Sequence, residues 1–253
     1  MSPSPSRPEL EVPPVVPWVE WAERQPTEKL QGQHILFQGP TQSGKTALCR
    51  ILARLRTFVV VCGTKPHDKS LDAYVAEGYI RIEQWPPTPR DWKRCREAWG
   101  ENEARFILWP HFKERDDLRR FSPIFARLLD DVFIDGRWCV VVDEGLWMAS
   151  PSGLGLGRQL GDVAYSTASN TVSLYLLVQR IANVPPVAWT SCSWAEIFHT
   201  GRTDDVRELA SLGTYPPRTT AEAVRKLTGH SFLDLPCRGG AEWAITTADP
   251  SWL

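Results

Sequence analysis

The feature that most constrains the fold of this chain is the segment GPTQSGKT at residues 39–46. It matches the pattern GxxxxGK[ST], follows an apolar run ending at Gln38, and leads into a helical pattern beginning at Lys45. A glycine-rich turn between a strand and a helix points backbone N–H groups inward and aims the positive helix N-terminus at the same spot. The segment therefore predicts a phosphate-binding loop.

Two side chains of this loop have separate expected tasks. Lys45 is expected to reach the β- and γ-phosphates of a nucleotide, and Thr46 to offer its hydroxyl to Mg²⁺. ATP is the expected substrate and Mg²⁺ the expected cofactor. The residues predicted to bind the nucleotide are Gly39, Pro40, Thr41, Gln42, Ser43, Gly44, Lys45, Thr46 and Ala47.

The rest of the chain alternates short apolar runs with helical patterns, which is typical of βαβ units. The fold class predicted is α/β: a P-loop NTPase of the RecA/ASCE type, with a mainly parallel central sheet covered by helices on both faces. Strands are expected at 34–38, 58–62, 79–82, 105–109, 138–142 and 172–178, with an edge strand at 242–246. Helices are expected at 18–24, 45–56, 118–132, 204–212 and 219–228.

The domain organisation follows from a change in composition near the N-terminus. Residues 1–17 hold six of the 21 prolines and are expected to form a disordered tail. Residues 18–253 are expected to form a single ATPase domain. Its core spans about 33–213, and C-terminal helices and an edge strand occupy about 204–253.

Polar residues at the ends of two later strands are candidates for catalysis. The apolar run 138–142 ends in Asp143 and Glu144, so Asp143 is expected to hold Mg²⁺ and Glu144 to polarise the attacking water. The run 172–178 ends in Gln179, which is expected to hydrogen-bond the γ-phosphate or the water. The alternative for Asp143 and Glu144 is that they form an acidic helix cap. The alternative for Gln179 is that it only satisfies backbone groups at the end of the strand.

Composition excludes several classes of protein. Lys and Arg number 29 against 30 Asp and Glu, so no global positive field attracts nucleic acid. The six cysteines form no CxxC pair, and no structural zinc is expected. No apolar run approaches the roughly 18 residues of a membrane span, and the N-terminus lacks the apolar region of a secretory signal. We therefore expect a cytoplasmic protein.

Three segments together resemble the FtsK/HerA superfamily of P-loop ATPases. They are GPTQSGKT, VVVDE at 140–144, and LVQRIANVPPVAWTSC at 177–192; IFHTGRTDDVRELASLG at 197–213 is also similar to the family's phenylalanine-bearing strand and acidic helix. The resemblance covers about 33–213. It implies an oligomeric ring, with a hexamer expected, that translocates, packages or transfers double-stranded DNA in a phage or mobile element, in the host cytoplasm if phage-encoded.

The chain departs from the family's pattern at two places. The family's second strand commonly ends in Asp-Pro-Lys, whereas Lys65-Pro66 here lacks the Asp, and residues 166–169 replace a Gly-Arg pair that can act across a subunit boundary. A catalytic arginine is still expected, because transition-state charge on the γ-phosphoryl group needs a fixed cation. The candidates are Arg158, Arg180 and Arg202, with Arg180 preferred.

Other functions remain open at this point. A morphogenesis or assembly ATPase without a DNA substrate fits the same motifs, as does a terminase-type ATPase lacking a nuclease domain. A small-molecule kinase fits less well, since it does not need Glu144. Two basic helix faces could contact DNA, although acidic neighbours favour a solvated face: Arg90, Lys93 and Arg94 on one, and Arg115, Arg119 and Arg120 on the other.

Overall fold

The computed structural model describes residues 12–65, 68–111, 117–165, 171–239 and 241–249. Within these ranges the strands form one nine-stranded sheet in the order β3-β4-β2-β5-β6-β1-β7-β8-β9. All pairings from β3 to β7 are parallel, while β8 and β9 extend the sheet antiparallel. The strands are β1 (Ile35–Gln38), β2 (Phe58–Cys62), β3 (Ile80–Ile82), β4 (Ala104–Leu108), β5 (Trp138–Val142), β6 (Ser173–Val178), β7 (Trp194–Phe198), β8 (Ser231–Pro236) and β9 (Ala244–Thr247).

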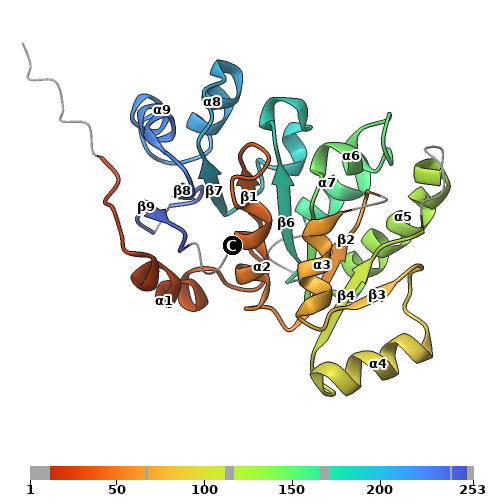
Figure 1. The fold of residues 1–253 in the computed structure, drawn as a ribbon. Coiled ribbons are helices and arrows are strands. Elements are labelled where there is room, and N and C mark those ends of the chain that lie inside the picture. Colours follow the sequence, from red (N-terminus) through yellow and green to blue (C-terminus); the bar gives the residue numbers. More distant parts are fainter. Residues whose placement is uncertain (1–11, 66–67, 112–116, 166–170, 240, 250–253) are drawn as a thin grey trace, which may run out of the picture.

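Helices cover both faces of this sheet, with α2 and α3 crossing its front in the view of Figure 1. The apolar side chains of α1, α2 and α3 pack on one face, and those of α5, α7, α8 and α9 pack on the other. The helices are α1 (Trp18–Glu28), α2 (Lys45–Ala53), α3 (Lys69–Ala76), α4 (Pro89–Trp99), α5 (Asp117–Asp135), α6 (Gly145–Ala149), α7 (Gly157–Tyr165), α8 (Thr203–Ala210) and α9 (Pro217–Lys226), with two 3₁₀ turns, η1 (Ile181–Asn183) and η2 (Pro186–Ala188).

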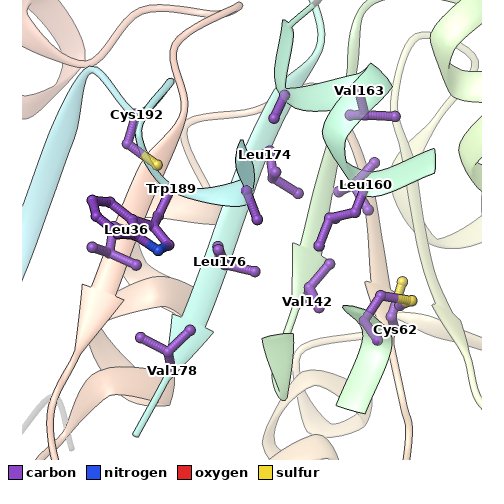
Figure 2. Packing of buried hydrophobic residues seen from close by; sticks show 14 of the residues in the cluster. Leu36, Cys62, Val142, Leu160, Val163, Leu174, Leu176, Val178, Trp189 and Cys192 are labelled. Atoms are coloured by element: carbon purple, nitrogen blue, oxygen red, sulfur yellow. The ribbon is translucent and has the colours of Figure 1, made fainter. Parts of the chain in front are cut away.

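Alternate residues of the parallel strands enter two separate cores. Tyr175 and Leu177 face α2, whereas Leu174 and Leu176 pack with Leu160 of α7 on the opposite side (Figure 2). A strand covered on both faces needs apolar residues at nearly every position. This is why the runs at 58–62 and 138–142 carry no polar alternation.

The structure confirms the predicted α/β class and the mainly parallel sheet with helices on both faces. Each of the six strands predicted between residues 34 and 178 is present within one residue of its expected ends, and the predicted edge strand is β9. The first helix is longer than expected, since it continues through Pro26 to Glu28. β8 was not predicted.

The N-terminal segment joins the sheet before the first helix begins. Val16 N donates to Ile245 O, and Ile245 N donates to Pro14 O, so residues 14–16 lie beside β9. Ordered structure therefore begins before residue 18. Residues 1–11 of the expected tail lie outside the described residues.

The end of α1 is attached to the antiparallel strands by a buried ionic network. The Lys29 ammonium lies 3.1 Å from Glu196 of β7 and 3.0 Å from Asp234 of β8, and all three side chains are at most 2% exposed. Trp21 Nε1 also donates to Asp234 at 2.6 Å. Burial lowers the pKa of Lys29, but the two carboxylates more than offset this and raise it. Burial, together with Asp234, raises the pKa of Glu196 to about 8. The network thus places a carboxyl group inside each of two strands, beside one buried ammonium.

His34 anchors the start of β1 as a neutral imidazole. Its Nδ1 accepts from Leu174 N at 2.9 Å, which leaves Nε2 to donate to Ala164 O at 3.0 Å. Burial lowers the pKa of His34 from 6.5 to about 4. An imidazolium could not accept the Leu174 bond, so the folded state resists protonation.

We expect this histidine to make stability fall in mild acid. Because its folded pKa is depressed, its contribution is present above about pH 6.5 and is lost as the pH falls toward 4. The free energy of unfolding, measured in urea, should fall by about 2 kcal/mol more between pH 7 and pH 5 for wild type than for His34→Gln, whose side chain does not titrate. Parallel pH dependences for the two proteins would contradict this assignment.

Candidate active site

The strand order brings four distant segments to one edge of the sheet. Strands β2, β5, β6 and β1 are consecutive neighbours and parallel, so the residues after their carboxyl ends lie close together. A cavity of about 410 Å³ opens there. It is lined by Thr41, Gln42, Ser43, Gly44, Lys45, Thr46, Ala47, Lys65, Asp68, Lys69, Ser70, Asp143, Glu144, Val178 and Gln179.

The loop between β1 and α2 has the backbone of an anion-binding turn. Gln42 and Gly44 have positive φ angles of 64° and 101°, and such alternation turns successive N–H groups toward one point. Gly39 admits no side chain, because a Cβ there would lie 2.7 Å from Phe198 Cβ and 2.9 Å from Ser43 Oγ. Ser43 Oγ is buried and has no hydrogen-bond partner among the described residues. The loop therefore offers unused donors at the start of α2.

Lys45 and Thr46 occupy the first turn of α2, where the helix dipole favours an anion. Lys45 Nζ donates to Pro40 O at 2.7 Å, which holds the ammonium over the loop. Burial lowers the pKa of Lys45 to about 8, against the opposing effect of Asp143 and Glu144. A bound phosphate would favour the charged form of this lysine.

Asp143 follows β5 and faces both Thr46 and Asp68. Thr46 Oγ1 donates to Asp143 Oδ1 at 3.1 Å, as expected if the two share one metal ion. Burial, together with the nearby Asp68 carboxylate, raises the pKa of Asp143 to about 6. This pair of carboxylates and a hydroxyl is the oxygen-rich donor set that Mg²⁺ prefers.

Asp68 was missed by the sequence analysis. It is the N-cap of α3, where its side chain accepts from Ser70 N at 3.0 Å. An Asp before a helix is a common cap, so its sequence context carried no signal for a catalytic site.

Glu144 is largely buried beside Asp143 and forms an ion pair with Lys65. Lys65 Nζ lies 2.8 Å from Glu144 Oε2. Burial lowers the pKa of Lys65, but its hydrogen bond to Glu144 raises the net value above the usual one. In the sequence, Lys65 stands out only as part of the Lys65-Pro66 turn that lacks the family's Asp. Its place beside Glu144 has no sequence signal, because β2 and β5 become neighbours only in the sheet.

Gln179 and Arg180, which follow β6, have different surroundings. Gln179 lines the cavity, as expected for a residue near the γ-phosphate. Arg180 points instead to α8, where its guanidinium contacts Asp204 and lies 3.4 Å from Asp205. The structure therefore does not bring Arg180 into the cavity of its own chain.

The other candidate cations also lie away from this cavity. Arg158 of α7 is 90% exposed and is 3.9 Å from Asp162, and Arg202 precedes α8. Neither arginine is among the residues that line the cavity. Residues 166–169 lie outside the described residues.

The first of the two basic faces considered for DNA is diluted by acidic partners. Lys93 lies 3.9 Å from Glu97, and Arg94 lies 3.6 Å from Asp91. Arg115 of the second face falls outside the described residues.

In the described part of the chain no helix is long and apolar enough to cross a bilayer. The described ranges also contain no group of three or more His, Cys, Asp or Glu side chains that could together hold a metal ion.

Comparison with known proteins identifies similar structures but no close relative in sequence. No protein-family model and no curated protein matches the chain. The genome packaging NTPase B204 of Sulfolobus turreted icosahedral virus 2, in complex with sulfate, aligns with a TM-score of 0.56 at 14% identity over 87% of this chain and 98% of its own. B204 is also known in complex with AMPPCP and with ATP-gammaS.

Two further structures align over most of the chain. The bacterial conjugative coupling protein TrwBdeltaN70 has a TM-score of 0.52 at 12% identity, covering 88% of this chain and 86% of its own. VirB4 of Thermoanaerobacter pseudethanolicus has a TM-score of 0.52 at 11% identity, covering 87% and 90%. At these identities the likeness concerns the fold. The chain therefore has the fold shared by the packaging NTPase B204, the coupling protein TrwBdeltaN70 and VirB4.

Proposed function

We propose that the chain is an ATPase that hydrolyses Mg²⁺-bound ATP to ADP and phosphate and uses the reaction to move double-stranded DNA. The observation that carries the ATPase assignment is the cavity shared by the 39–46 loop, Asp143, Glu144 and Gln179. The fold supports it, since B204 with the same fold binds AMPPCP and ATP-gammaS. The DNA substrate is proposed by analogy with the packaging and conjugative proteins of this fold.

Each residue of the cavity has one proposed task. The loop N–H groups and Lys45 bind the phosphates, while Thr46 and Asp143 would hold Mg²⁺. When bound, Mg²⁺ neutralises charge on the β- and γ-phosphate oxygens. Glu144 accepts a proton from the attacking water, and Gln179 orients that water or the γ-phosphate.

The ring is the proposed working form. Among the described residues that line the cavity there is no arginine. In related enzymes a neighbouring subunit can supply this cation, so hydrolysis then requires an interface. Arg180 is our candidate, and it would have to leave Asp204 and Asp205 to serve the next subunit of a hexameric ring.

The Lys45→Ala variant should lose nucleotide binding while keeping its fold, because it removes the ammonium that Pro40 O holds over the loop. Binding of a fluorescent ATP analogue and circular dichroism together measure the two properties. Lys93→Ala removes the same charge from an exposed position of α4 and should bind like wild type. Normal turnover by folded Lys45→Ala would refute the phosphate loop.

Glu144→Gln should bind ATP but hydrolyse it about 10²–10⁴-fold more slowly, because the amide keeps the shape and loses the base. Asp143→Asn should instead weaken the Mg²⁺-dependent part of nucleotide affinity, measured by titration with and without the metal. If Glu144→Gln turns over at the wild-type rate, Glu144 is only a helix cap and the water is activated elsewhere.

The ATPase rate per chain should rise with protein concentration and with double-stranded DNA, because both favour ring closure. Salt should weaken the DNA effect only modestly, since the chain carries no excess of Lys and Arg over Asp and Glu, and Lys93 and Arg94 have acidic partners. An ATPase assay with and without DNA, beside a measurement of oligomeric state, tests this. A monomer with DNA-independent turnover would reject the motor and leave an assembly ATPase.

Mixed rings test the trans-acting arginine directly. Arg180→Ala should bind ATP without turnover, and mixing it with Lys45→Ala should restore part of the activity, since some interfaces then join an intact loop to an intact arginine. Arg218→Ala, on the exposed side of α9, is the matched control and should remain active. Failure of the mixture to recover activity would rule out Arg180.

A further inference from the structure

Lys65 is a second lysine in the candidate active site, and it points to an exchange of partners during the reaction. We propose that the Lys65 ammonium leaves Glu144 for the γ-phosphate when ATP binds, so that ATP frees the carboxylate that accepts a proton from the attacking water. The inference rests on the proposed ATPase function. Lys65 would then contact the γ-phosphate when ATP is bound, and would occupy the Glu144 carboxylate when ATP is absent.

The position of Lys65 is set by its backbone. Its carbonyl accepts from Trp109 Nε1 at 2.7 Å, and Gly63 N donates to Leu108 O at 2.9 Å, so the segment after β2 is fastened to β4. A Cβ on Gly63 would lie 2.8 Å from both Trp109 and Leu71, which leaves the backbone little freedom. The side chain of Lys65, by contrast, is 40% exposed and lines the cavity. The backbone of Lys65 is therefore held in place, while its half-exposed side chain can move its ammonium from Glu144 to another acceptor.

Only a few cations can reach a nucleotide in this cavity. Of its described lining residues, Lys45, Lys65 and Lys69 are basic. Lys45 is held over the loop by Pro40 O, while Lys69 begins α3 and is exposed. Lys65 alone among them contacts the catalytic carboxylate, so its ammonium lies where the base and the transferred phosphoryl group must meet.

Charge explains why the partner would change. With Glu144, the lysine neutralises one carboxylate in a cavity that also holds Asp68 and Asp143. A γ-phosphate brings more negative charge than a single carboxylate and attracts the same ammonium more strongly. While Lys65 Nζ lies 2.8 Å from Glu144 Oε2, that oxygen accepts from the ammonium rather than from a water. Departure of Lys65 therefore leaves Glu144 Oε2 to accept from the attacking water only when a γ-phosphate is present.

The Lys65→Met variant separates this role from simple support of Glu144. We expect about 10-fold weaker binding of AMPPCP, which keeps a γ-phosphate, and affinity for ADP within about 2-fold of wild type. ATP turnover should fall about 10-fold or more, and Lys65→Arg should recover most of the AMPPCP affinity because it keeps the charge. Lys93→Met is the control for loss of one lysine.

Several outcomes would overturn the proposal. Equal losses of ADP and AMPPCP affinity would show a structural effect, and reduced turnover with unchanged affinities would show that Lys65 acts only through Glu144. Faster turnover by Lys65→Met would show that the Lys65–Glu144 ion pair only slows hydrolysis. If wild type binds neither nucleotide, the ATPase function itself fails, whereas wild-type affinities in Lys65→Met reject the role of Lys65 alone.

Discussion

The close approach of Gly39 to Phe198 is the contact on which the site depends. It lets the chain leave β1 against β7 with no side chain in between, and a Cβ on Gly39 would also press on Ser43 within the loop. The loop can then turn through the positive φ angles of Gln42 and Gly44 and start α2 with its N–H groups facing the cavity. A larger residue would displace the loop that carries Lys45.

The parallel sheet then decides which residues accompany the loop. Because β6 lies beside β1, and β5 and β2 follow in order, Gln179, Glu144 and Lys65 meet at one edge although they are far apart in the chain. The antiparallel extension serves a different purpose. It is joined to α1 by Lys29, whose buried ammonium contacts one carboxyl group from each of two adjacent strands.

Much of this architecture could be predicted from periodicity. The apolar runs at 58–62 and 138–142 indicate doubly covered strands, and these are observed at the predicted positions. β8 escaped prediction because Asp234 interrupts its apolar pattern, and a buried carboxylate is tolerated there only through Lys29 and Trp21, more than two hundred residues earlier. No local pattern carries a contact of that kind.

The phosphate loop, the acidic pair after β5 and the α/β class can be predicted from the amino-acid sequence, because each is a local pattern of residue types at fixed spacing. The partners of those residues follow from the folded sheet. It placed Asp68 beside Asp143, Lys65 on Glu144, and Arg180 on the acidic start of α8. Ion pairs between side chains depend on which strands become neighbours, and strand order is a property of the folded sheet rather than of any segment within it.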